Sequence, residues 1–204
     1  MLHGCNVVAK LLTILPVTDE PEIAPRVLDA AIRVLAKTGW EELSLERVAE
    51  AAGVSRVTLW RRGVRREGLV QALLGRLARD YRDSMWAVLT APGTGRDRLE
   101  RALETLCAVA DRHLDLLLAS DSAFHRAWAE ARPHVDFLGP FVRIIEEGVA
   151  DGTLRSLGDP VEVADLLFNA VCWPYVHLRG RHEWPAAGAA ARVIGLVLDG
   201  AAAP

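Results

Sequence analysis

The chain has 204 residues, 51% of them hydrophobic and 25% charged, a composition typical of a globular protein and unlike that of a disordered or fibrous one. The net charge of −3 excludes a protein that binds nucleic acid through its overall charge. Three widely spaced cysteines, Cys5, Cys107 and Cys172, support neither a disulfide framework nor a zinc knuckle, and they fit a reducing, cytoplasmic setting.

The N-terminal 20 residues contain one apolar run, residues 7–17. The run is too short to span a bilayer and lacks the small-residue cleavage site of a signal peptide. We therefore expect residues 1–20 to be a disordered tail, or to lie upstream of the true start codon, and we expect no association with a membrane.

The first convincing helix opens at Pro21 and Pro25 and runs to about Lys37, with a broad apolar stripe along it and Gly39 at its end. Trp40 is expected to cap the small core that this helix forms with the next two.

Residues 45–60, LERVAEAAGVSRVTLW, have the pattern of a helix-turn-helix. Ser44 and Ser55 stand where each can cap a helix, and Gly53 stands where the turn requires a left-handed residue. The second helix of this pair is short and is expected to run from Arg56 to Arg62.

Arginines occupy most of the exposed positions of that second helix, namely Arg56, Arg61 and Arg62, and no acidic residue follows until Glu67. Residues 55–82 carry eight arginines and two acids, and segments of net negative charge lie on both sides, as a localised DNA-facing surface requires. Arginine binds phosphate oxygens and guanine edges, and threonine binds phosphate or the thymine methyl group. The alternative interpretation of this stretch is an ordinary helix-turn-helix corner inside an all-α enzyme.

An apolar residue recurs every four positions from Leu69 to Leu89, which predicts one long helix over residues 66–89. Further helices are expected over residues 97–113 and 114–118, from Asp121 to Pro133, over 135–150 with an interruption at Gly139-Pro140, over 160–179 with a bend at Pro174, and over 185–199. No stretch alternates with a period of two, so the sequence predicts an all-α fold.

These features resemble the TetR/AcrR family of bacterial transcriptional regulators over residues 22–200. The most specific part is residues 45–60, followed by Arg66-Glu67 and Leu69, and a weaker match is GVADGTLR at residues 148–155 with Asp159-Pro160 and Ala164. The resemblance implies an all-α, dimeric repressor that a small molecule releases from its operator. It also implies an N-terminal three-helix helix-turn-helix domain over residues 21–68, followed by a larger helical ligand-binding and dimerisation domain over residues 69–200.

The resemblance further implies which residues contact an operator in double-stranded DNA. Trp60 stands where the family has a phosphate-contacting Tyr, Arg62 where it has Tyr or His, and Arg66 where it has Lys. Gly63 replaces a usual Phe, which predicts a looser join between the recognition helix and the helix that follows. The predicted DNA-binding set is Ser44, Ser55, Arg56, Val57, Thr58, Trp60, Arg61, Arg62 and Arg66, with Arg56 and Thr58 near base edges.

Aromatic side chains with a few polar tips in the C-terminal part of the chain suit a flat or apolar small molecule, whose identity the sequence does not specify. The candidate ligand-binding residues are Trp86, Cys107, Phe124, His125, Trp128, Phe168, Cys172, Trp173 and Tyr175. Each of these positions also fits an ordinary core residue.

Small and apolar residues on the last two predicted helices favour a homodimer through a four-helix bundle. The residues expected in this interface are Ala164, Phe168, Val171, Ala190, Val193, Ile194 and Val197. The alternative is that these residues complete the core of the monomer.

Catalysis has little support in the residue inventory. The six histidines include no pair four residues apart on a helix, and no glycine-rich phosphate loop is present. Asp111 and Asp115 flank His113, but acids on helix faces are usually solvated. We therefore expect no catalytic residue, no metal site and no cofactor.

Two rival hypotheses remain from the sequence. One is a helical ligand-binding or scaffolding protein that has lost specific DNA binding, which Gly63 favours; the other is a helical enzyme. The sequence does not distinguish a repressor from an activator.

Overall fold

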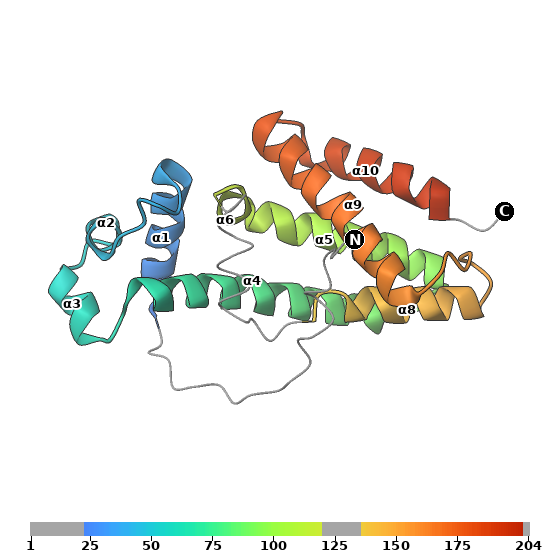
Figure 1. The fold of residues 1–204 in the computed structure, drawn as a ribbon, viewed down its shortest axis with the longest axis horizontal. Coiled ribbons are helices and arrows are strands. Elements are labelled where there is room, and N and C mark those ends of the chain that lie inside the picture. Colours follow the sequence, from blue (N-terminus) through green and yellow to red (C-terminus); the bar gives the residue numbers. More distant parts are fainter. Residues whose placement is uncertain (1–22, 120–135, 202–204) are drawn as a thin grey trace, which may run out of the picture.

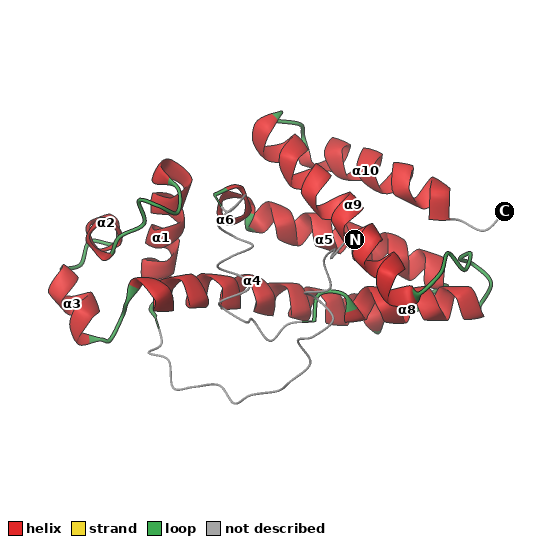
Figure 2. Cartoon of the chain, viewed as in Figure 1, coloured by secondary structure: helices red, strands yellow, loops and turns green. Residues whose placement is uncertain are grey.

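The computed structural model describes residues 23–119 and 136–201. Within these ranges every regular element is a helix, as Figure 2 shows, and the expected all-α fold is confirmed. The helices are α1 (Pro25–Thr38), α2 (Leu45–Ala51), α3 (Arg56–Arg61), α4 (Arg66–Leu89), α5 (Gly95–Arg112), α6 (Leu114–Leu118), α8 (Gly139–Ala150), α9 (Pro160–Arg181) and α10 (Ala186–Ala201). The tail expected over residues 1–20 and the helix expected from Asp121 to Pro133 lie outside the described residues.

Helices α1, α2 and α3 form a small unit, the head, at one end of α4, at the left of Figure 1. The helix caps expected from the sequence are confirmed. Ser44 Oγ accepts a hydrogen bond from the Arg47 amide at 3.3 Å, and Ser55 Oγ accepts one from the Thr58 amide at 3.0 Å. Gly53 has a φ of 64°, the left-handed conformation that the turn between α2 and α3 needs.

Helix α4 spans 24 residues and runs from the head along the rest of the molecule (Figure 1). Of the side chains predicted to recur on one face, Leu69, Leu73, Leu77, Tyr81 and Met85 are buried and Leu89 is partly buried. Because this face packs along most of the helix, α4 is a continuous structural link between the head and the C-terminal bundle.

Helix α5 lies at the centre of the C-terminal bundle, in contact with α4, α8, α9 and α10. It begins at Gly95, two residues before the expected start. Thr94 and Asp97 form a capping box there, in which each side chain accepts a hydrogen bond from the other residue's amide.

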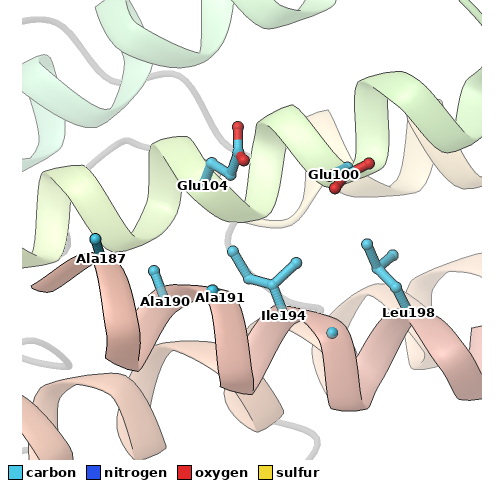
Figure 3. Close-up of a pocket in the computed structure, with 8 residues that line it drawn as sticks. Glu100, Glu104, Ala187, Ala190, Ala191, Ile194 and Leu198 are labelled. Carbon is cyan, nitrogen blue, oxygen red and sulfur yellow. The ribbon is translucent and has the colours of Figure 1, made fainter.

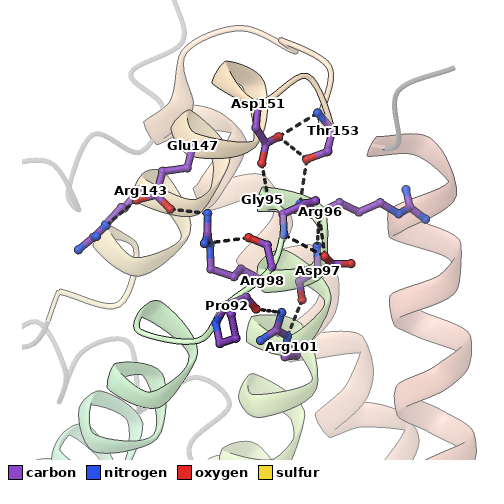
Figure 4. A network of polar contacts seen from close by, with 12 residues as sticks. Pro92, Gly95, Arg96, Asp97, Arg98, Arg101, Arg143, Glu147, Asp151 and Thr153 are labelled. Atoms are coloured by element: carbon purple, nitrogen blue, oxygen red, sulfur yellow. Dashed lines mark hydrogen bonds and ion pairs between the residues drawn. The ribbon is translucent and has the colours of Figure 1, made fainter.

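Helices α5 and α8 approach so closely at their crossing that neither has room for a side chain. A Cβ atom added to Gly95 would lie 2.1 Å from the Cα atom of Gly148. Figure 4 shows the polar contacts that fix this junction: Asp151 Oδ2 accepts a hydrogen bond from the Gly95 amide at 2.7 Å, and Thr153 Oγ1 accepts one from the Arg96 amide at 3.1 Å.

The interruption expected at Gly139-Pro140 is wrong. Helix α8 begins at Gly139, so Pro140 occupies the first turn, where its missing N–H costs no helical hydrogen bond. Asp136 Oδ1 accepts hydrogen bonds from the amides of Leu138 and Gly139 at 3.1 and 2.7 Å. This side chain therefore satisfies N–H groups that the start of the helix leaves free.

The predicted dimer interface needs correction, because most of its residues are used inside one chain. Ala164, Val171, Val193 and Ile194 are buried, and Phe168, Ala190 and Val197 are partly buried against the same core. The outward surfaces carry other apolar side chains: Leu166 of α9 is 69% exposed and Leu196 of α10 is 80% exposed. The residues predicted for the interface thus lie on the inner faces of the two helices, where they complete the core of one chain.

The crossing of α5 and α8 predicts the effect of one added methyl group. Gly95→Ala should lower the free energy of unfolding by about 1–3 kcal/mol, because the helices must separate to admit it. Gly75→Ala in α4 is the control, since its Cβ atom would meet only the end of the Arg79 side chain at 3.4 Å and alanine stabilises a helix interior. Urea unfolding measures both, and equal stability of Gly95→Ala and the wild type would contradict the prediction.

Candidate DNA-binding surface and its link to the C-terminal domain

Helix α3 presents basic and aromatic side chains to solvent. Leu59 is its buried residue and packs it against the head. The exposed side chains are Arg56, Val57, Trp60 and Arg61, with Arg62 directly after the helix. Three guanidinium groups and one indole N–H are therefore available on one short helix, and such donors suit phosphate oxygens and base edges.

The three hydroxyl groups in the predicted DNA-binding set already have partners within the head. Thr58 is half-buried and its Oγ1 lies 2.8 Å from Ser55 Oγ, and Ser44 caps α2. The guanidinium groups of Arg61 and Arg62, in contrast, have no hydrogen-bond or ion-pair partner among the described residues. The two arginines are thus the freest donors on this surface.

Arg56 is paired with an acid that the sequence analysis did not single out. Its Nη1 lies 2.7 Å from Glu46 Oε1, and both side chains are more than half exposed. A base edge or a phosphate must replace this carboxylate if Arg56 is to bind DNA. Glu46 therefore holds the guanidinium in place and competes with any ligand for it.

Arg66 joins α4 to the head. Its Nε donates to the carbonyl oxygen of Leu43 at 2.9 Å, and its Nη2 donates to that of Trp40 at 2.7 Å. These two carbonyl groups belong to the loop between α1 and α2, so one side chain fixes the start of α4 against the opposite side of the head. The proposed phosphate contact of Arg66 has to be made by its remaining N–H groups.

The join after α3 is built without the Phe that Gly63 replaces. Gly63 has a φ of 71° and reverses the chain. Val64 is buried directly after it, and its amide donates to the carbonyl oxygen of Leu59 at 3.0 Å. Val64 thus ties the turn to the end of α3, and Arg66 ties the start of α4 to the loop between α1 and α2.

Two further contacts connect the head with the rest of the chain. Asp29 of α1 forms an ion pair with Arg76 of α4 at 2.5 Å, and α1 packs against α6. The head is therefore held at three places: at the start of α4, along its first turns, and from the side of α6.

The corner between α5 and α6 carries a buried histidine that is tied to α4. His113 Nε2 lies 2.9 Å from Asp80 Oδ2, and Arg112 donates to both oxygens of the same carboxylate at 2.9 and 3.0 Å. Burial is the main cause that lowers the pKa of His113 below its ordinary value of 6.5. The hydrogen bond from Arg112 is the main cause that lowers the pKa of Asp80, so at neutral pH the corner holds a neutral imidazole beside a carboxylate.

One candidate ligand-binding residue, Phe168, lies in an aromatic cluster of the C-terminal bundle whose other members were not predicted. The ring of Phe168 lies edge-to-face with those of Tyr81, Phe137 and Phe141, at centroid distances of 6.1–6.5 Å. Tyr81 belongs to α4 and Phe168 to α9. This aromatic cluster therefore connects the helix that carries the head with a second helix of the bundle.

The remaining candidates are divided between the core and the surface. Cys107 and Cys172 are buried, and burial raises the pKa of each thiol to about 12, so both remain protonated at neutral pH. Tyr175 is buried and donates to Asp111 Oδ1 at 3.2 Å. Trp173 is half-buried, Trp86 is 67% exposed, and Phe124, His125 and Trp128 lie outside the described residues.

A groove of about 360 Å³ lies elsewhere, between α5 and α10 (Figure 3). Glu100 and Glu104 form one wall, and the other is lined by Ala187, Ala190, Ala191, Ile194, Gly195 and Leu198. None of the predicted ligand-binding residues lines this groove. Its small residues were visible in the sequence, but their pairing with two glutamates of α5 depends on tertiary structure.

Among the described residues, no helix is long and apolar enough to cross a bilayer.

The contribution of the two Arg66 hydrogen bonds to stability can be tested separately from that of its charge. Arg66→Met and Arg66→Lys should each lower the free energy of unfolding by about 1.5–3 kcal/mol, because a lysine keeps the charge but cannot reach both carbonyl groups. Arg65→Met, which removes the exposed neighbouring arginine, is the control and should unfold like the wild type. If Arg66→Lys is as stable as the wild type in urea, the two hydrogen bonds do not hold the head.

The corner at His113 predicts a dependence of stability on pH. Because the folded-state pKa of His113 lies below 6.5, its contribution is complete above that pH and is lost as the pH falls from 6.5 towards the folded-state value. Urea unfolding at pH 7.5 and 5.5 should show a smaller loss on acidification in His113→Gln than in the wild type. An identical loss in the two proteins would contradict the prediction; Asp80 titrates in a separate range, below 3.8.

Comparison with known proteins agrees with this architecture. Residues 27–73 match the model of the tetR family of bacterial regulatory proteins. Over 49 residues the chain is 43% identical to YvkB of Bacillus subtilis (strain 168), an uncharacterized HTH-type transcriptional regulator, and this match covers 24% of the chain and 26% of that protein. The chain thus matches about a quarter of the length of this relative.

Two solved structures share the fold over nearly their whole length. A TetR/AcrR-family regulator from Thermobifida fusca has a TM-score of 0.64 and 21% identity, with coverage of 86% of this chain and 96% of that one. The regulator FadR from Bacillus subtilis, in complex with stearoyl-CoA, has a TM-score of 0.71 and 16% identity, with coverage of 86% and 97%. The head thus matches the tetR family of bacterial regulatory proteins over residues 27–73, and the chain as a whole shares its all-α fold with solved structures of TetR/AcrR-type regulators.

Proposed function

We propose that the protein is a sequence-specific DNA-binding transcriptional regulator, a repressor that a small molecule releases from its operator. The observation that carries this proposal is the surface of α3, where Arg56, Arg61 and Arg62 are exposed on a capped helix-turn-helix. A positively charged surface is unusual in a chain whose net charge is −3. Such a surface attracts the negatively charged phosphate groups of DNA.

The contacts to DNA are divided between the arginines. Arg56 lies in the first turn of α3, where a recognition helix reaches base edges, and its release from Glu46 makes a bidentate contact to guanine possible. Arg61 and Arg62 lie at the other end of the helix and bind phosphate, which positions the protein without selecting a sequence.

Two copies act together, with their heads about 34–36 Å apart so that both recognition helices enter the major groove on one side of the duplex. We assign the dimer contact to the outward surfaces of α9 and α10, on which Leu166 and Leu196 are largely exposed. Exposed apolar side chains on two neighbouring helices favour a four-helix bundle between two chains.

The ligand acts through α4, between a head over residues 21–68 and a ligand-binding domain over residues 69–200. Tyr81 of α4 belongs to the aromatic cluster around Phe168, so an apolar molecule inserted there displaces α4 and with it the head that Arg66 holds. The complex of the related FadR with stearoyl-CoA supports an apolar ligand. A hundredfold preference of the ligand for the released state corresponds to about 2.7 kcal/mol of coupling.

Fluorescence anisotropy with the DNA upstream of the gene tests this proposal. Binding should weaken steeply with salt, with a log–log slope of about −5 to −9 if the dimer contacts six to ten phosphates. Arg62→Ala should weaken binding to all sequences alike, whereas Arg56→Ala should relax the preference for the operator over a scrambled duplex. Arg82→Ala, which removes an exposed arginine far along α4, is the control, and equal, sequence-independent losses from Arg56→Ala and Arg62→Ala would contradict the division of roles.

A further inference from the structure

Two exposed histidines meet at the C-terminal end of α9. The Nε2 atoms of His177 and His182 share a hydrogen bond of 3.0 Å, which an ion bound to both nitrogens would replace, and the two ring planes make an angle of 63°. Both side chains are open to solvent. We propose that this pair binds a divalent transition-metal ion of the Cu²⁺ or Ni²⁺ class.

The distance between the two nitrogens fits a particular coordination geometry. Imidazole nitrogens bind such ions at about 2.0–2.1 Å, so two nitrogens at a right angle are about 2.9 Å apart, and two at a tetrahedral angle about 3.4 Å apart. The separation of 3.0 Å is close to the right-angle value. Square-planar and octahedral ions have right angles between neighbouring ligands, and Cu²⁺ and Ni²⁺ adopt these geometries with nitrogen ligands.

The turn after α9 holds His182 beside His177. The amide of Trp184 donates to the carbonyl oxygen of Leu178 at 3.0 Å, which closes the chain back onto the helix. Trp184 is held in turn from α10, because the Arg192 guanidinium lies 5.5 Å from the centre of its indole ring. The two imidazoles are therefore brought together by an ordered turn, and a metal ion would find the pair already assembled.

The charges around the pair are of both signs. The free carbonyl groups at the end of a helix carry partial negative charge, and the last turn of α9 contains Arg181 and Arg179, of which Arg179 is paired with Asp111 at 2.6 Å. No third His, Cys, Asp or Glu side chain completes a metal group with this pair among the described residues. Water would fill the remaining positions, so we expect an exchangeable ion and not a permanent structural one.

A bound ion would connect the last turn of α9 with the turn that leads into α10. The site could not be predicted from the sequence, because the two histidines are five residues apart. Their side chains meet because α9 ends at Arg181, between them. The usual spacing for a metal pair on a helix is four residues.

Titration of the untagged, full-length protein with Cu²⁺ tests the proposal. The wild type should bind one ion per chain in this site, and electron spin echo modulation should show two coordinated imidazoles. His177→Gln and His182→Gln should each lower the affinity at least tenfold and leave at most one imidazole on the ion. Glu183→Gln is the matched control, since it removes the adjacent exposed carboxylate and should keep both imidazoles.

Ni²⁺ provides a second measurement that does not depend on the copper spectrum. It should raise the melting temperature of the wild type and of Glu183→Gln, and should not raise that of either histidine variant. Because both histidines are exposed, the variants should fold normally in the absence of metal, which circular dichroism verifies. The assignment would be overturned if the protein with both His177→Gln and His182→Gln still showed two coordinated imidazoles. It would also be overturned if both single variants bound Cu²⁺ as tightly as the wild type.

Discussion

The attachment of the head to α4 is the constraint on which the rest of the structure depends. The head is a unit of three short helices, and its orientation is set by few contacts. Arg66 donates to the carbonyl groups of Trp40 and Leu43, and Val64 is buried at the turn before α4. These contacts tie the start of α4 to α3 and to the loop between α1 and α2, so the position of the head depends on that of α4.

Besides the packing of α5 and α8 against α4, two groups of side chains join the C-terminal bundle to this helix. The aromatic cluster joins Tyr81 of α4 to Phe168 of α9, and the corner at His113 joins the α5–α6 turn to Asp80 of α4. Helix α6 also packs directly against α1 of the head. The switch that we propose runs along α4, and the contact between α6 and α1 is a second connection between the bundle and the head.

Features with a local cause could be predicted from the sequence, and features with a tertiary cause could not. Ser44, Ser55 and Gly53 act on backbone within a few residues, so the helix-turn-helix followed from the sequence. The interruption predicted at Pro140 was wrong because a proline in a first turn and one in a helix interior look alike without the preceding cap at Asp136. The carbonyl groups that bind Arg66 lie 23 and 26 residues away along the chain. The small apolar residues of α9 and α10 suit a dimer interface and a monomer core equally, so the sequence could not tell their inner faces from their outer ones.

Selection of binding sites from a pool of random DNA duplexes tests the central claim most directly, since the operator sequence need not be known. A recognition helix that enters the major groove as half of a symmetric pair predicts enrichment of inverted repeats whose half-site centres lie one helical turn, about 10–10.5 base pairs, or a multiple of it, apart. Recovery of duplexes without any shared sequence, even at low ionic strength, would contradict the claim and leave only the helical fold.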